Sequence, residues 1–182
     1  MEKVNEMISV QETKAKKKNK GFSLVELIIV IAIMAILVGV VGTQVLPYME
    51  KARQAKDTQV ISAICTAAVT AFAENADTIS ADATLTYADN AAYALTPATA
   101  ITSTGAGKID TSLKGLLGVV STDNLFDSYL NSVTTDTKAT KLESKIGKTA
   151  TSIVISYTYA TGAVTVQLKA GTADVLGSVT SK

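Results

Sequence analysis

Histidine is absent from the 182-residue sequence, and cysteine occurs once, at Cys65. Without histidine, the chain cannot use Ser-His-Asp or Cys-His catalysis, histidine-ligated zinc or the usual general base near neutral pH. A single cysteine excludes an intramolecular disulfide. Aromatic residues make up only 5% of the chain, so a core must form from many small contacts. The sequence predicts no catalytic set, no metal site and no cofactor, and we expect the protein not to be an enzyme.

A large excess of charge of either sign is also missing. Residues 1–21 hold six lysines and three glutamates, a net charge of +3. The remaining residues hold 11 basic and 13 acidic side chains, a net charge of −2. Because this balance provides no Lys/Arg-rich face for phosphates, nucleic-acid binding is not predicted. The length suits one domain of ordinary size and an appendage.

A long apolar run follows the basic segment. Every residue from Leu27 to Gly42 is apolar or glycine, and the run extends over residues 22–46. This is enough to cross a hydrocarbon layer of ~30 Å as a helix. The preceding lysines favour a cytoplasmic N-terminus, so the rest of the chain should face outward. The alternatives are a secretory signal peptide, whose apolar region is shorter, and a plain single-pass anchor.

The residues at the start of this run form a specific motif. Residues 21–27 read Gly-Phe-Ser-Leu-Val-Glu-Leu. With the basic leader and the apolar run, this segment resembles the cleavage and assembly motif of type IV prepilins. The resemblance is strongest over residues 14–50 and fades after about Phe72. It implies that a membrane prepilin peptidase cuts between Gly21 and Phe22 and then N-methylates Phe22.

The resemblance also implies partners and a location. The expected partners are the prepilin peptidase, an inner-membrane platform protein, an assembly ATPase and further copies of the chain in a helical filament. The precursor would be a single-pass protein of the cytoplasmic membrane, and the mature subunit would lie in an extracellular pilus. Such filaments are associated with cell adhesion and twitching motility.

Glu26 is the one charged residue of the apolar run. An ionised carboxylate at mid-membrane costs ~2.5–3.5 kcal/mol, so it persists where a partner awaits it. Cleavage would create a cation on Phe22, about one helical turn away. By the resemblance, Glu26 of an incoming subunit pairs with the Phe22 amine of a neighbour, and a buried pair is costly to leave half made. A glutamate that only reaches the membrane interface is the alternative.

Two features of the apolar run bear on helix packing. Small residues at steps of three and four predict one helix face that another backbone can approach closely, either in a fibre or in generic membrane packing: Ala32, Ala35, Gly39 and Gly42. Residues 38–47 should be a weak stretch of helix because of their glycines, β-branched residues and Pro47. Pro47 cannot donate to the carbonyl of Thr43, so we expect a kink or a stretch that unwinds inside a fibre.

Beyond Pro47 the helix should continue to about Asn75 and become amphipathic. A stripe with helical spacing predicts that one side lies against a core: Val60, Ile61, Ile64, Cys65, Ala68, Val69 and Phe72. Cys65 falls on this stripe and is interpreted as a small core residue. Many pilins have a cysteine pair that closes a C-terminal loop, and this chain lacks it.

The C-terminal part changes to a period of two. Residues 153–159 and 164–168 predict a β-hairpin with its turn at residues 160–162. Either residues 174–180 or residues 139–146 could add a third strand. The apolar face of this sheet needs a cover, and the helical stripe is the expected one.

The region between the helix and the hairpin is the least regular. Residues 77–112 are rich in Ala, Thr, Ser and Asp, which predicts a surface connection with short helical or strand pieces around residues 81–94. A short helix or turn is expected at residues 113–120. Residues 121–130 should form another short segment that starts with capping residues at Ser121.

Two other motifs do not support a function. Residues 105–108 read Gly-Ala-Gly-Lys, but a phosphate-binding loop requires an earlier glycine and a Ser or Thr after the lysine. Asp123, Asp127 and Asp136 lack the spacing of a calcium loop and are expected to be solvated surface charges.

These observations predict an α+β fold in which a long N-terminal α-helix packs against a small antiparallel β-sheet, the pilin fold. We expect a basic leader (1–21), a transmembrane and assembly half of the helix (22–46), an amphipathic half (47–75) and a globular head with C-terminal antiparallel strands (76–182). The expected function is a structural subunit of a type IV pilus-like filament. The alternatives are a pseudopilin of a type II secretion or DNA-uptake system and an unprocessed single-pass membrane protein.

Overall fold

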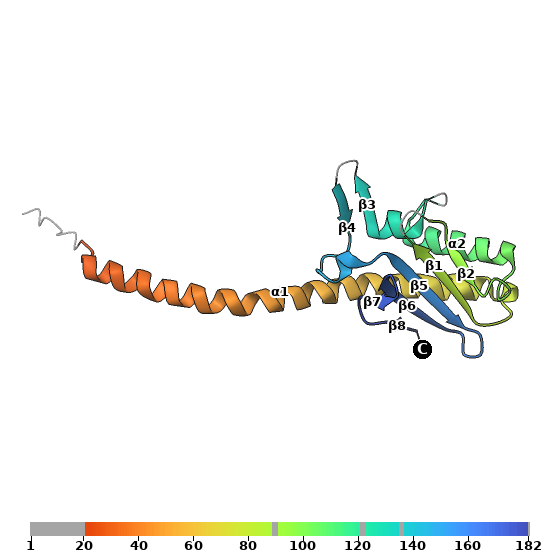
Figure 1. Cartoon of the computed structure of the whole chain (residues 1–182), viewed down its shortest axis with the longest axis horizontal. Helices are drawn as coiled ribbons and strands as arrows, with labels where there is room; N and C mark the ends of the chain where they lie inside the picture. The colour runs from red at the N-terminus through yellow and green to blue at the C-terminus, as the bar shows by residue number, and fades with distance from the viewer. Residues whose placement is uncertain (1–20, 89–90, 121–122, 135–136, 182) are drawn as a thin grey trace, which may run out of the picture. The chain divides into compact units, whose positions relative to one another are not determined.

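The computed structural model describes residues 21–88, 91–120, 123–134 and 137–181 (Figure 1). The chain divides into two compact units, residues 1–44 and residues 45–182. Helix α1 (Leu24–Glu74) contributes its first part to the N-terminal unit and its second part to the C-terminal unit. Of the predicted leader, only Gly21 lies within the described residues.

The helical part of the N-terminal unit has no buried side chain. All residues from 21 to 49 are exposed, although nearly all of them up to Leu46 are apolar. Within the described residues, α1 is the one helix that is long and apolar enough to cross a membrane, judged by length and composition. The predicted long N-terminal helix is confirmed.

The predicted weak stretch does not interrupt this helix. Gly39, Gly42 and Pro47 all lie inside α1, and the hydroxyl of Thr43 donates to the carbonyl of Val40 at 3.0 Å. This bond provides local support one turn before the proline. Unwinding inside a fibre stays a prediction, because it concerns the assembled state.

The C-terminal unit contains a six-stranded antiparallel sheet. Its strands are β1 (Ala83–Ala88), β2 (Ala94–Thr96), β5 (Ser152–Thr158), β6 (Ala163–Ala170), β7 (Ala173–Asp174) and β8 (Val179–Thr180). The strand order is β2-β1-β5-β6-β7, and β8 also pairs with β6. The predicted hairpin is confirmed as β5–β6, and Gly162 provides its positive φ of 68° in the turn.

The two candidates for a third strand have different outcomes. Within residues 174–180, the pairs Thr165–Thr180 and Val166–Val179 join β8 to the hairpin, so this segment does extend the sheet. The other candidate, residues 139–146, does not. Its start belongs to β4 (Thr137–Thr140), which pairs with β3 (Asn131–Thr134) in a separate two-stranded sheet.

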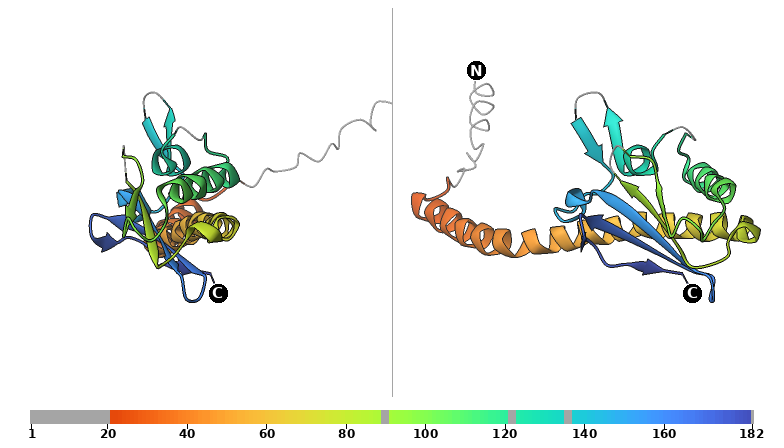
Figure 2. Two further views of the ribbon diagram at one scale, coloured as in Figure 1. Left: turned by 90° about the vertical axis from the view of Figure 1, so that its right-hand side faces the viewer. Right: turned by 45° about the vertical axis from the view of Figure 1, so that its right-hand side comes forward.

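One face of the main sheet is apolar and forms the core with two helices. Alternate residues of β1, β5 and β6 are buried in register, as in the row of Leu85, Ile155 and Val166. The second part of α1 and helix α2 (Ser103–Leu117) lie beside each other against the sheet (Figure 2, left). The fold is therefore the predicted α+β arrangement of a long N-terminal helix and a small antiparallel sheet.

The predicted stripe of α1 is the cover of this face. Ile61, Ile64 and Ala68 are fully buried, and the ring of Phe72 stacks on the ring of Tyr157 with centroids 4.8 Å apart. Cys65 is 3% exposed, which confirms it as a core residue. Burial raises the pKa of the Cys65 thiol.

The prediction of a surface connection over residues 77–112 is wrong, although the short strand pieces expected around residues 81–94 are present as β1 and the start of β2. After a short 3₁₀ turn at η1 (Ala76–Thr78), strand β1 enters the sheet between β2 and β5. Residues 103–112 then form most of α2, whose Ile109 is fully buried. The segment packs through small and widely spaced apolar residues, and such residues give a weak periodic signal in the sequence.

The ends of α2 explain the neighbouring segments. The hydroxyl of Thr102 accepts a hydrogen bond from the Gly105 amide at 3.1 Å, and Gly118 ends the helix in the left-handed conformation. Leu113 to Leu117 are thus the end of α2 and not a separate short helix. Gly105 lies in the first turn of α2, close to Thr78, so residues 105–108 do not form a phosphate loop.

A π-helical turn, η2 (Phe126–Leu130), follows α2. The side chain of Asn124 accepts a hydrogen bond from the Phe126 amide at 2.7 Å and donates to the carbonyl of Ala88 at 2.9 Å. Asn124 therefore holds the start of this turn against the end of β1. The capping residue predicted here, Ser121, lies outside the described residues.

Candidate processing and assembly site

The N-terminus of α1 is held by a reciprocal pair of hydrogen bonds. The carboxylate of Glu26 accepts a hydrogen bond from the backbone amide of Ser23, with Oε2 2.8 Å from the nitrogen. The hydroxyl of Ser23 accepts one from the amide of Val25 at 3.3 Å. Serine before the first helical residue and glutamate three residues later form a capping box, which satisfies amides that a helix leaves without partners.

The predicted cleavage residues lie just before this cap. Gly21 and Phe22 precede the helix, and neither has a regular backbone conformation. The side chain of Phe22 is 91% exposed. The first helical backbone bond joins the Leu27 amide to the Ser23 carbonyl at 3.2 Å, so the Gly21–Phe22 bond lies outside the hydrogen-bonded helix.

Only one of the two carboxylate oxygens of Glu26 accepts a hydrogen bond from the described residues. Oε2 bonds to Ser23, whereas Oε1 makes no hydrogen bond to any residue that the structure describes. Because a carboxylate accepts several hydrogen bonds, Glu26 can cap its own helix and accept a further donor at the same time. The side chain is exposed, so a donor from another molecule can reach it.

The small residues of α1 present an open surface. Ala32, Ala35, Gly39 and Gly42 are all exposed, and a Cβ added at either glycine would meet no atom within 4 Å. A flat strip of this kind lets a second helix backbone come close. Within this chain, no described residue occupies that strip.

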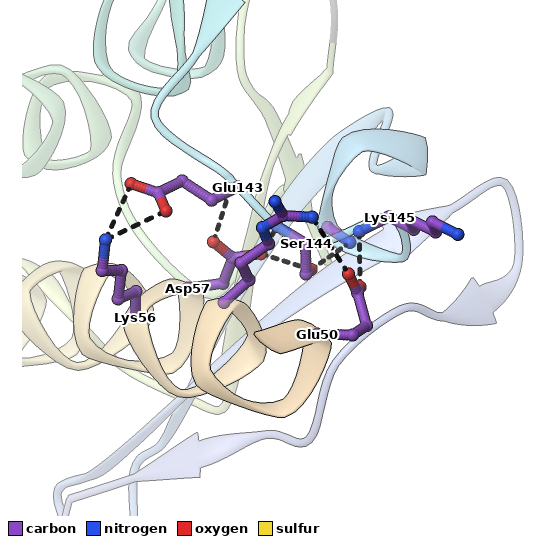
Figure 3. Close-up of polar contacts among 8 residues, drawn as sticks. Glu50, Lys56, Asp57, Glu143, Ser144 and Lys145 are labelled. Carbon is purple, nitrogen blue, oxygen red and sulfur yellow. Dashed lines mark hydrogen bonds and ion pairs between the residues drawn. The ribbon is translucent and has the colours of Figure 1, made fainter. Parts of the chain in front are cut away.

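A second polar site lies in the C-terminal unit, where Asp57 of α1 is fully buried (Figure 3). Its Oδ1 accepts a hydrogen bond from the Glu143 amide at 2.7 Å. Its Oδ2 accepts bonds from both the amide, at 3.0 Å, and the hydroxyl of Ser144. The same hydroxyl accepts a bond from the Gly147 amide at 2.8 Å. One carboxylate thereby organises the start of the turn that leads into η3 (Gly147–Thr149).

Exposed ion pairs and hydrogen bonds surround this buried carboxylate. Lys56 pairs with Glu143 at 3.0 Å, and the Lys145 amide donates to Glu50 at 2.6 Å. Together with Asp57, these contacts fasten residues 143–147 to α1 at three successive points. The arrangement holds the turn on α1, and the remaining oxygen of Glu50, Oε2, is buried without a hydrogen bond and lies 3.7 Å from the guanidinium of Arg53.

Three acidic residues of the C-terminal unit line a cavity of about 450 Å³ beside β1 and α2. Tyr87, Tyr93, Asp110, Asp123 and Asp127 are among its lining residues. Burial and then the charge of Asp110 raise the pKa of Tyr87 well above its usual value. Asp123 is exposed and Asp127 is half-buried, and Asp136 lies outside the described residues. No group of three His, Cys, Asp or Glu side chains able to hold a metal ion is found in the described part of the chain.

Comparison with known protein families gives one match. Residues 16–42 match the model of the prokaryotic N-terminal methylation motif. The class of motif predicted from Gly21, Phe22 and Glu26 is therefore confirmed. No curated protein and no solved structure matches the chain.

The motif and the fold together define a broad class of protein. They support a secreted-filament subunit of the type IV pilin or pseudopilin kind, a class that is generally not enzymatic. The motif implies processing by a prepilin peptidase and assembly in a membrane system. It also fits a membrane-anchored precursor together with the apolar part of α1.

The sequence analysis assigned no role to three of the polar residues described above. Ser23 could have been found, because Ser-x-x-Glu before an apolar run is the signature of a capping box. Asp57 also carries a signal, since it lies four residues before Ile61 and thus on the buried stripe of α1. Ser144 carries none, because its role depends on a turn that meets α1 only in the folded chain.

Proposed function

We propose that the chain is the precursor of a type IV pilus-like filament subunit. In this proposal, the prepilin peptidase hydrolyses the Gly21–Phe22 bond and methylates the new amine of Phe22. The support is positional: the methylation motif covers this bond, and the bond lies outside α1 in an exposed segment.

The single observation that carries the proposal is the contrast between composition and burial in α1. Its residues from Leu24 to Leu46 are almost all apolar, and each is exposed. An apolar surface of this extent needs a non-aqueous partner. In the precursor, lipid covers this apolar surface. In the filament, the same helices of other copies cover it.

The proposed register of assembly depends on Glu26 and Phe22. In the filament, the methylated amine of a neighbour's Phe22 donates a hydrogen bond to Glu26 of the arriving subunit. The acceptor is Oε1, the carboxylate oxygen that the capping box does not use. The strip of Ala32, Ala35, Gly39 and Gly42 then allows close helix packing. An inner-membrane platform protein and an assembly ATPase would drive insertion, and the mature subunit would lie in an extracellular pilus.

The mass of the mature N-terminus tests processing. The chain is produced in membranes with a prepilin peptidase, purified, and analysed by intact-mass and peptide mass spectrometry. The expected product begins at Phe22 and carries one added methyl group. An intact Met1 would instead identify an unprocessed single-pass membrane protein.

Variants at Glu26 test assembly. Glu26→Val should insert into the membrane and still be cut, although more slowly because the capping box loses its carboxylate, and it should fail to enter filaments because the buried amine of the neighbour has no carboxylate partner. Glu26→Gln is the matched control, since it keeps the shape and the cap but removes the charge. Normal filaments from both variants would remove Glu26 from the mechanism.

The kind of machine is tested in cells. Long extracellular fibres that contain this chain identify a pilin, with adhesion and twitching as the functions to examine. If cells that lack the chain lose secretion or DNA uptake, and cells that have it show no fibres, the chain is a pseudopilin.

A further inference from the structure

The capping box has a consequence for the reaction that removes the leader. Helix α1 begins at Leu24 because Ser23 takes a non-helical position and uses both its hydroxyl and its amide in the cap. The helix therefore starts two residues after the bond that is cut. Glu26 contributes its Oε2 to this arrangement and fixes the same boundary from inside the helix.

This boundary determines the state of the scissile bond. A peptide bond inside a helix has its amide and carbonyl groups in hydrogen bonds and is flanked by side chains of the adjacent turns. A protease must unwind such a bond before water can attack its carbonyl carbon. Gly21 and Phe22 are exposed and lie outside the helix, so their peptide bond requires no unwinding.

The sequence before the bond makes the cap necessary. Asn19 is a residue type that caps helices, and Lys20, which follows it, has good helix propensity. If Ser23 did not cap α1, a helix starting after Asn19 would place Gly21 and Phe22 in its first turn. Gly21 opposes this extension only in part, because glycine weakens a helix without excluding it.

We infer that Ser23 is a positioning residue for leader removal, because its cap keeps the Gly21–Phe22 bond in exposed, non-helical backbone. This inference depends on the proposed processing. In the reaction, water adds across the bond, which leaves a carboxylate on Gly21 and a free amine on Phe22. Ser23 acts through the helix boundary and takes no part in the chemistry.

The test is the rate of leader removal from the full-length precursor in detergent micelles with purified prepilin peptidase. Ser23→Ala removes the cap and should slow cleavage by about fivefold, since loss of a serine cap changes helix-end populations by roughly that factor. Ser23→Thr and Ser23→Asn both restore a capping side chain. They should cut within about twofold of the wild-type rate.

The choice of Asn separates the cap from direct recognition. Asn caps a helix but has no hydroxyl, so slow cleavage of both Ala and Asn variants alongside fast cleavage of Thr would show recognition of the hydroxyl and overturn the inference. Equal rates for Ser23→Ala and wild type would also overturn it. Backbone carbon chemical shifts of Gly21 and Phe22 in the precursor provide the structural readout, and the Ala variant should shift towards helical values.

Glu26→Gln separates this inference from the proposed function. Gln at this position maintains the capping box, so this variant should be cut at the wild-type rate even where filament assembly is lost. Slow cleavage of Glu26→Gln, with its shifts unchanged, would count against the role of the cap. A wild-type precursor that the peptidase does not cut at all would refute the proposed function, whereas a rapidly cut Ala variant refutes the positioning role alone.

Discussion

The two parts of α1 have the same secondary structure and opposite surroundings. From Leu24 to Gln44 almost every residue is apolar, and none is buried. From Ile61 to Phe72 it is apolar on one side, and that side is buried against the sheet, whereas residues 45–49 are still exposed. One continuous helix thus packs within the chain along one part and has no packing partner among the described residues along the other.

This difference shows where the stability of each part comes from. Most helical stability in proteins comes from tertiary packing and not from propensity. The second part of α1 receives that packing from β1, β5 and β6. The first part contains glycines and β-branched residues and receives none from the described residues, and in the proposed function lipid or other subunits supply it.

The largest expected effect comes from removing a core side chain on the buried side. Ile64→Ala should destabilise the C-terminal unit by about 3 kcal/mol, because Ile64 is fully buried and the cavity left behind cannot collapse completely. Chemical denaturation of the full chain in micelles, followed by tyrosine fluorescence, measures this change. Ile33→Ala is the matched control, since Ile33 is 52% exposed and should change the same transition by less than about 0.5 kcal/mol. Similar losses of unfolding free energy for both variants would contradict the difference between the buried and the exposed part of α1.

The buried carboxylate of α1 should have an effect nearly as large. Asp57→Ala leaves the amides of Glu143 and Ser144 without their acceptor, which should cost about 2–3 kcal/mol in unfolding free energy. Amide hydrogen exchange of residues 143–147 should accelerate in the same variant. Asp77→Ala replaces an exposed aspartate of η1 and should leave both measurements unchanged. Unchanged exchange in Asp57→Ala would mean that other contacts hold the turn.

The close approach of the turn to α1 predicts a smaller loss. A Cβ at Gly147 would lie 2.2 Å from Oδ2 of Asp57 and 2.8 Å from the hydroxyl of Ser144. Gly147→Ala should therefore push the turn away from α1 and lower the free energy of unfolding by about 1–2 kcal/mol. Gly107→Ala in α2 is the control, because a Cβ there meets nothing within 4 Å and alanine favours helix. A neutral Gly147→Ala would show that the turn can move at no cost.

The smallest effect is a dependence on alkaline pH. Burial and the charge of Asp110 hold the pKa of Tyr87 well above its usual value near 10, so the folded chain keeps this proton where the unfolded chain loses it. The contribution of Tyr87 to the free energy of unfolding is thus fully present below about pH 10. Above that pH it decreases by at most about 1.4 kcal/mol per pH unit. Denaturation at pH 9 to 11 should show a steeper loss for wild type than for Tyr87→Phe. Parallel curves would contradict a raised pKa.

The sequence predicted the parts of the fold that have strong periodicity. The stripe through Ile61, Ile64 and Phe72 and the alternation in β5 and β6 revealed the helix, the hairpin and their contact. Strand β1 was expected only as an undefined helical or strand piece, and most of helix α2 was missed, because their buried positions include small residues such as Ala83 and Ala106, which produce little contrast with their polar neighbours.

The candidate site was predictable to a different degree. Gly21, Phe22 and Glu26 followed from a motif, and the motif is confirmed, although their roles in cleavage and assembly stay predictions. The partners of Asp57 could not be predicted, because they come from a turn 86 and 87 residues later in the chain. Contacts over such separations depend on tertiary geometry, which a local pattern does not encode.

The way the C-terminus is attached has a consequence for export. Strand β8 pairs with β6, the Ser181 amide donates to the Val164 carbonyl at 2.9 Å, and the Ser181 hydroxyl accepts from the Val164 amide at 2.9 Å. Hydrogen bonds thus hold the final strand in a chain whose one cysteine excludes an intramolecular disulfide. If the chain is exported as proposed, this strand forms without a thiol-oxidising catalyst, and reducing surroundings leave it in place.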